Sequence, residues 1–183
     1  MGQRRSGDDK VARGIDARPA MAFFKERVDE AYAQREVRTS EDAAYYLVQL
    51  LTRFVCPSGR LADVGPRPPH PLGGMLLTAA QEHDSYRRFV ILRDVGDMSL
   101  LLAGFFAESL RQRCVGADYY ADLGGAAYGS AAETCQPSAN AVVFEELACN
   151  FLIFAGVLAD VAARCDLADE DTVRGTWSRV VAS

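Results

Sequence analysis

The chain has only two histidines among its 183 residues, and its five cysteines follow no metal-binding spacing. His70 and His83 belong to no HExxH, ExxH or HxH pattern, so the sequence predicts no metal site. The number of cysteines is odd, and no two of them have CxxC spacing. The sequence therefore predicts neither a disulfide framework nor a zinc centre. We therefore expect reduced thiols in the core, no cofactor and a cytoplasmic location.

Motifs for phosphoryl transfer and hydrolysis are also missing. No glycine pair stands in the strand–turn–helix setting of a phosphate-binding loop with its lysine, and no GxSxG elbow occurs. A Cys–His catalytic pair would require the fold to bring a cysteine next to one of the two histidines by chance. The cysteines are expected in the core, where thiols are typically inert. The sequence therefore predicts no catalytic residue and favours a protein that is not an enzyme.

Neither a basic run nor a membrane-length apolar run is present. The net charge is −5, and the arginines at 4–5 and 87–88 are isolated pairs, so no nucleic-acid surface is expected. The stretch 98–107 is apolar on every side of a helix, but it is far shorter than the roughly 20 residues that span a bilayer. Residues 1–20 are polar and aperiodic, which predicts a loose tail, no signal peptide and no membrane insertion.

What the chain does have is helical periodicity from Met21 onward. A stretch that is apolar on every side must be buried on every side, which predicts a central helix over roughly 97–113. No alternating, strand-like pattern competes with the helical one. The sequence therefore predicts an all-α fold, with a single domain over 21–183 and about six or seven helices around the central helix.

Capping residues and breakers set the expected boundaries of these helices. The run TSED at 39–42 has the hydroxyl and carboxylates of a helix start. The pair Gly96 and Asp97 is open to two interpretations: a kink in one helix over 85–113, or a break where Asp97 caps a second helix. The Pro/Gly-rich segment 57–74 is expected to be a long loop that connects helices.

Two carboxylates of the predicted central helix are candidates for an internal polar site. Asp97 and Glu108 are eleven residues apart, three helical turns, so they lie near one stripe. If the chain is an enzyme, this pair and the tyrosines are its acid–base candidates. The stronger interpretation is that Asp97 caps the helix and Glu108 leaves the core beside Arg111.

One predicted helix combines three glycines with three tyrosines in the run DYYADLGGAAYG. Tyr120, Gly124 and Tyr128 are spaced four and four, so two rings flank a gap opposite the small residues of 103–107. Glycine costs about 1 kcal/mol in a helix interior, and a tight helix crossing is the stronger explanation for it. The alternative is a slot for a flat or aromatic ligand, lined by Tyr119, Tyr120 and Tyr128.

The clearest periodic pattern is an a/d stripe of large apolar residues on one predicted helix, sustained over nearly three heptads. A second apolar stripe follows near the C-terminal end. We expect these stripes to extend beyond the internal core and to contact another copy of the chain or another protein. The candidate interface residues are Leu147, Phe151, Phe154, Leu158, Val161 and Trp177.

The stretches TSEDAAYYLVQLLTRF, LRDVGDMSLLLAGFFAESL and DYYADLGGAAYG resemble segments of uncharacterised helical proteins from GC-rich bacteria. The resemblance covers most of residues 21–163 and implies no activity, cofactor or catalytic residue. The sequence thus favours a non-enzymatic, cytoplasmic helical bundle that acts through protein–protein contact, by self-association or as an adaptor or regulator. The alternative is a sensor that binds a small apolar ligand near Tyr120 and Tyr128.

Overall fold

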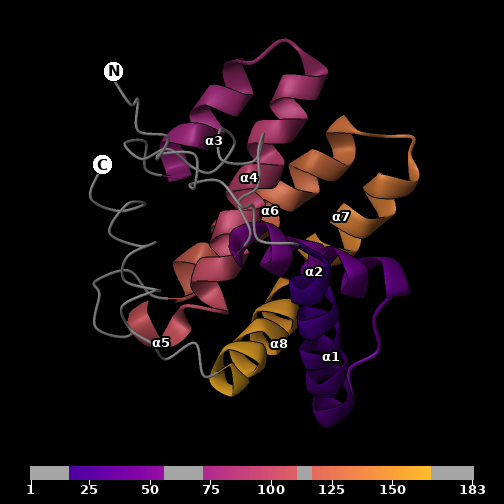
Figure 1. Cartoon of the computed structure of the whole chain (residues 1–183). Helices are drawn as coiled ribbons and strands as arrows, with labels where there is room; N and C mark the ends of the chain where they lie inside the picture. The colour runs from indigo at the N-terminus through magenta and orange to yellow at the C-terminus, as the bar shows by residue number, and fades with distance from the viewer. Residues whose placement is uncertain (1–16, 56–71, 111–116, 166–183) are drawn as a thin grey trace, which may run out of the picture.

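The computed structural model describes residues 17–55, 72–110 and 117–165 (Figure 1). These ranges contain eight α-helices and no strand, which confirms the all-α prediction. Helix α5 is a single turn of four residues, and the other seven helices are longer. The helices are α1 (Ala17–Arg35), α2 (Glu41–Val55), α3 (Leu72–Gln81), α4 (Ser85–Ala103), α5 (Ala107–Leu110), α6 (Ala117–Thr134), α7 (Ala139–Cys149) and α8 (Phe151–Arg164).

Helix α4 forms the centre of the bundle and packs against α3, α6 and α8. Helices α3 and α4 form a hairpin at one end of the molecule, and α1 and α8 lie side by side at the other (Figure 1). Nine residues between Leu92 and Ala103 are buried, because neighbours cover this part of α4 on every side. The buried central helix is thereby confirmed, although its bounds differ from the predicted 97–113.

Helix α4 is capped by Asp84 at its start and by Gly104 at its end. At its N-terminal end, the Asp84 carboxylate accepts the backbone N–H of Arg87 at 2.8 Å, as an N-cap does. The helix then runs without a break through Gly96 and Asp97, so neither residue ends or starts a helix. Its C-cap is Gly104, and the chain resumes helical structure only in α5.

The break at Gly104 lies where α8 crosses α4. A Cβ at Gly104 would lie 2.6 Å from the backbone oxygen of Ala155 and 2.8 Å from the Cβ of Leu158. Only glycine permits this approach of the two backbones. The expectation that the small residues of 103–107 face the Gly/Tyr helix is wrong at Gly104, because this residue faces α8.

The helix that was predicted to carry the a/d stripe is two helices in the structure, α7 and α8. Their axes are bent by 81° at Asn150. The bend turns the a/d stripe of both helices inward, where it contributes to the common core. The interface prediction is therefore wrong for the residues of this stripe, since they are covered by the chain itself. These core residues are Leu147, Phe151, Phe154, Leu158 and Val161. Trp177, the sixth predicted interface residue, lies outside the described residues.

The remaining boundaries follow the sequence closely. The hydroxyl of Ser40 accepts the backbone N–H of Ala43 at 3.0 Å, so α2 begins where its capping residues predict. Helix α1 begins at Ala17, inside the predicted tail of 1–20, and α3 begins at Leu72, inside the predicted loop. The rest of that tail and loop lies outside the described residues.

Across the described ranges, no helix taken singly has the length and hydropathy to cross a membrane. The bent pair α7 and α8 passes that test only when its two arms are counted together.

Candidate functional site

A buried carboxylate joins three helices in the middle of the bundle. Asp97 of α4 is 8% exposed, and its Oδ1 accepts the hydroxyl of Tyr46 from α2 at 2.5 Å and that of Tyr128 from α6 at 2.8 Å. Its Oδ2 lies 3.2 Å from Nη2 of Arg53, also on α2. We refer to Asp97, Tyr46, Tyr128 and Arg53 as the Asp97 cluster.

Helical spacing and one glycine bring these side chains together. Tyr46 and Arg53 are seven residues apart, two turns of α2, so they lie on the same face. A Cβ at Gly96 would lie 2.5 Å from the ring of Tyr128, so glycine is needed for this ring to pack directly against α4. Gly96 and Asp97 therefore work as a pair, one making room for the ring and the other accepting its hydroxyl.

The cluster keeps both tyrosines in the donor form. Burial raises the pKa of Tyr46 and of Tyr128 well above the usual tyrosine range, and the negative charge of Asp97 raises both further. The guanidinium of Arg53 lies over the ring of Tyr46, with its Cζ 5.6 Å from the ring centroid. Two neutral hydroxyls and one cation thus compensate a single buried carboxylate.

A second ion pair lies beside the cluster on α4. Nη2 of Arg93 is 2.7 Å from Oδ1 of Asp94, and their side chains are 21% and 15% exposed. Burial raises the pKa of Asp94 to about 6, and the charge of Asp97 raises it too, while Arg93 and Arg53 oppose the rise. Asp94 is therefore the acid here whose charge changes just below neutral pH.

This arrangement suits a structural clamp better than a catalytic site. A general base needs a lone pair within reach of a substrate proton, but both oxygens of Asp97 already accept donors from the protein. A buried network in which one carboxylate accepts three donors fixes the helices that supply them. The cluster therefore holds α2, α4 and α6 together.

The structure does not bring the two predicted carboxylates together. Glu108 lies in α5, beyond the break at Gly104, and is exposed, whereas Asp97 is buried in the middle region of the bundle. The interpretation of Asp97 as a helix cap is wrong, because it lies well inside α4. Its true partners stand 51 and 31 residues away in sequence, and local spacing does not reveal them.

The predicted ligand slot at Gly124 is filled by the chain itself. A Cβ at this glycine would lie 2.3 Å from Cε2 of Phe151 and 2.7 Å from the Cβ of Ser99. The helix-crossing interpretation thus accounts for Gly124, with α4 and α8 both approaching α6. The structure offers no room for a flat ligand at this point.

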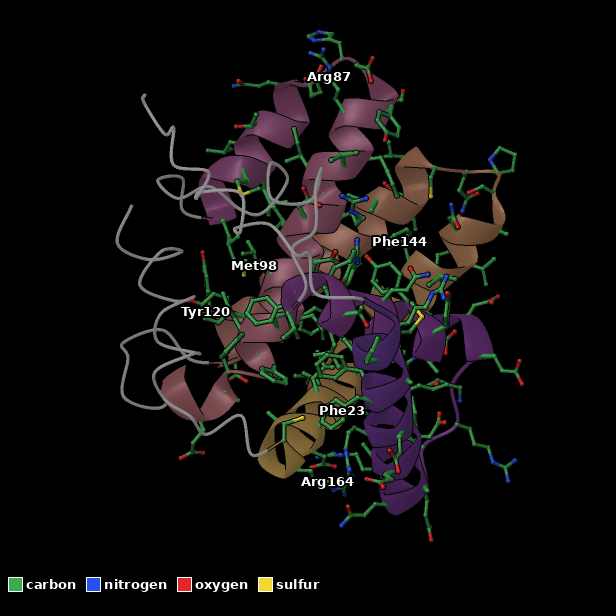
Figure 2. All side chains as sticks on the ribbon, in the orientation of Figure 1. Phe23, Arg87, Met98, Tyr120, Phe144 and Arg164 are labelled. Carbon is green, nitrogen blue, oxygen red and sulfur yellow. The ribbon has the colours of Figure 1, made fainter. Side chains whose placement is uncertain are left out.

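The three predicted slot tyrosines also lie in different surroundings. Tyr128 is fully buried and its ring centroid is 5.8 Å from that of Phe144, whereas Tyr119 is 48% exposed. Tyr120 is partly buried and packs edge to face against Tyr119, with ring centroids 5.3 Å apart. Figure 2 shows Tyr120 and Phe144, the ring neighbour of Tyr128, on different sides of the bundle. Tyr120 and Tyr128 therefore do not line one slot.

An open surface hollow of about 500 Å³ lies elsewhere, at the C-terminal end of α1. None of its lining residues belongs to the predicted ligand site. The lining consists of Tyr32, Ala33, Glu36, Val37 and Arg38. As far as the chain is described, no three His, Cys, Asp or Glu side chains gather in a way that could hold a metal ion.

The outward side of α7 and α8 carries a feature that the sequence analysis missed. Val142 is 63% exposed, Leu152 64% and Ile153 39%, and the thiol of Cys149 is free and exposed. Val142 and Cys149 are two turns apart on α7, with the exposed Glu145 between them on the same side, and Leu152 and Ile153 follow directly after the bend. We refer to these four residues as the outer α7–α8 face. They lie outside the a/d stripe, on which the interface prediction was based.

No known protein family, curated protein or solved structure matches this chain. The resemblance to helical proteins of GC-rich bacteria therefore stays a prediction. What is established is an all-α bundle whose core is locked by a buried carboxylate and whose outward side exposes large apolar side chains.

Proposed function

We propose that the protein is a non-enzymatic helical module that acts by contacting another protein surface through its outer α7–α8 face. The supporting observation is the exposure of large aliphatic side chains there, above all Leu152 at 64% and Val142 at 63%. Burying such a side chain is worth about 1.5–3 kcal/mol, which a partner surface supplies and water does not. Contiguous apolar surface on a folded chain is typical of interaction sites.

The interior of the bundle supports this proposal over the ligand sensor. The predicted slot is filled by the Phe151 ring, and the acceptor oxygens of Asp97 are occupied by protein donors. Neither place offers a small molecule a cavity with free polar groups, which a ligand site requires. The proposal places the protein in the cytoplasm, where an exposed free thiol such as Cys149 stays reduced.

Site-specific photo-crosslinking in cells of the source organism tests the proposal. A photoreactive phenylalanine analogue replaces Leu152 in one variant and Leu77 of α3, which is 68% exposed, in a matched control. We expect a crosslinked protein product from position 152 and little from position 77, because only the first lies on the proposed contact face. No product at 152, or equal products at both positions, contradicts the proposal.

A further inference from the structure

We infer that the partner at the outer α7–α8 face is a protein surface on which a lysine or arginine stands among apolar side chains. The inference rests on the proposed function and names the chemistry of the partner. The outward side of α7 carries one charged group, because Glu145 is exposed between Val142 and Cys149. A surface that covers the apolar side chains there also covers this carboxylate, and burying a carboxylate without a compensating cation is costly.

The three carboxylates of α7 and α8 differ in how the chain compensates them. Asp160 forms a two-point ion pair with the arginine that ends α1, with Nη2 to Oδ1 at 3.0 Å. Glu146 accepts the backbone N–H of Ser40 at 2.9 Å as well as its hydroxyl. Glu145 accepts only the neutral amide of Gln136, at 2.6 Å, and no cation of the described ranges pairs with it. Glu145 is therefore the carboxylate on these helices that a partner can still neutralise.

The sequence that carries the face has no basic side chain. Residues 114–163 include none of the chain's 20 lysines and arginines and neither of its two histidines, but they include six carboxylates. Attraction to anionic lipid headgroups depends on such cations, so charge argues against a membrane as the occupant. A two-fold contact with a second copy is disfavoured as well, because it brings a second Glu145 to the same patch. The partner therefore has to supply the cation.

Helical spacing sets how close together the cation and the apolar side chains of the partner have to be. Glu145 follows Val142 by three residues and precedes Cys149 by four, so it lies roughly 5 Å along the axis of α7 from each. Lysine and arginine suit this spacing, because their aliphatic stems pack on apolar surface while the charged head stays at a polar group. One basic side chain can therefore cover Val142 and pair with Glu145, beside apolar side chains that cover Leu152.

Titration of the purified full chain with two designed helical peptides tests this inference. Both peptides carry the same leucines along one face, and the positions that flank the leucines are lysine in one peptide and glutamate in the other. We expect the glutamate peptide to bind the wild type about tenfold more weakly than the lysine peptide, as measured by fluorescence anisotropy at physiological salt. Glu145→Lys should weaken binding of the lysine peptide about fivefold and strengthen binding of the glutamate peptide, because it reverses the charge on the face.

Matched variants separate this face from the general acidity of the chain. Glu26→Lys, at an exposed carboxylate of α1, changes the net charge by as much as Glu145→Lys does. Leu77→Gln makes on α3 the change that Leu152→Gln makes on the face, at a similar exposure. We expect Glu26→Lys and Leu77→Gln to bind the lysine peptide like the wild type, whereas Leu152→Gln weakens binding. Thermal unfolding of all four variants should match the wild type, because each position is exposed.

Equal weakening by Glu145→Lys and Glu26→Lys, or equal binding of the two peptides, overturns the inference. Self-association of the wild type, or its binding to phosphatidylserine vesicles, overturns it too if Leu152→Gln abolishes that association or binding. If the peptides show no preference while position 152 still crosslinks to another protein, the inference fails and the proposed function stands. Absence of any crosslink at position 152 removes both.

Discussion

Asp97 brings a charge into the core, which is costly unless nearby donors compensate it. Two tyrosine hydroxyls and the guanidinium of Arg53 supply that compensation from two other helices. One side chain thus holds the helices α2, α4 and α6 in place relative to one another. Removing a single donor should therefore affect the whole bundle rather than one helix.

Tyr128→Phe removes one of these donors and keeps the ring that lies against Gly96. We expect it to lower the free energy of unfolding by about 1–3 kcal/mol, the usual loss when a charged acceptor forfeits a buried hydrogen bond. Urea unfolding followed by circular dichroism measures the change. Tyr86→Phe, at a residue that is 75% exposed, is the control and should shift stability little. Equal stabilities for both variants contradict the clamp.

Asp94 gives stability a pH dependence with a definite sign. Its pKa rises from 3.8 to about 6 on folding, so the folded state binds the proton more tightly than the unfolded chain. The contribution of Asp94 is therefore fully present below about pH 4 and is lost as the pH rises through about 6. We expect Asp94→Asn to flatten the change in unfolding free energy between these values, as measured by urea unfolding at several pH values. Parallel pH profiles for the two proteins are inconsistent with this assignment.

At the scale of the helix, two glycines of α6 stand in opposite surroundings. A Cβ at Gly124 meets the Phe151 ring at 2.3 Å, whereas a Cβ at Gly129 meets its nearest neighbour, Ala148, at 3.9 Å. Gly124→Ala should destabilise the protein by about 1–3 kcal/mol through overpacking. Gly129→Ala should stabilise it by up to about 1 kcal/mol through helix propensity.

Thermal and urea unfolding of these two alanine variants distinguish a filled helix crossing from an open slot. Phe151→Leu, which shortens the obstructing side chain, should partly restore the stability of Gly124→Ala. A stable Gly124→Ala variant, or the same effect at both glycines, shows instead that the gap is open to a ligand.

Helices and their starts could be predicted from sequence because their causes are local. Ser40 and Asp84 each cap a helix that begins one residue later, and the buried stripe of α8 follows helical spacing. The breaks at Gly104 and Asn150 could not be predicted in the same way. The first lies where α8, far along the chain, crosses α4, and the second redirects a stripe that is continuous in sequence.

At the scale of the whole molecule, the all-α class could be predicted because hydrophobic spacing and an absence of strand-like alternation decide it. The candidate sites were harder to predict from the sequence. The partners of Asp97 are distant in sequence, and Leu152 and Ile153 resemble ordinary core residues until the bend at Asn150 turns them outward. Periodicity in the sequence identifies apolar residues that share one face of a helix. Where a helix has apolar residues on two faces, tertiary packing decides which face stays exposed.

A native mass spectrum of the purified full chain distinguishes a protein-contact module from a ligand-binding sensor, since it reports assembly and bound molecules at once. We predict bare chains of 19.9 kDa, or a multiple of that mass, with no added mass of a few hundred daltons. A chain that carries a few hundred additional daltons, lost on denaturation, would contradict the proposed function and indicate a bound small molecule instead.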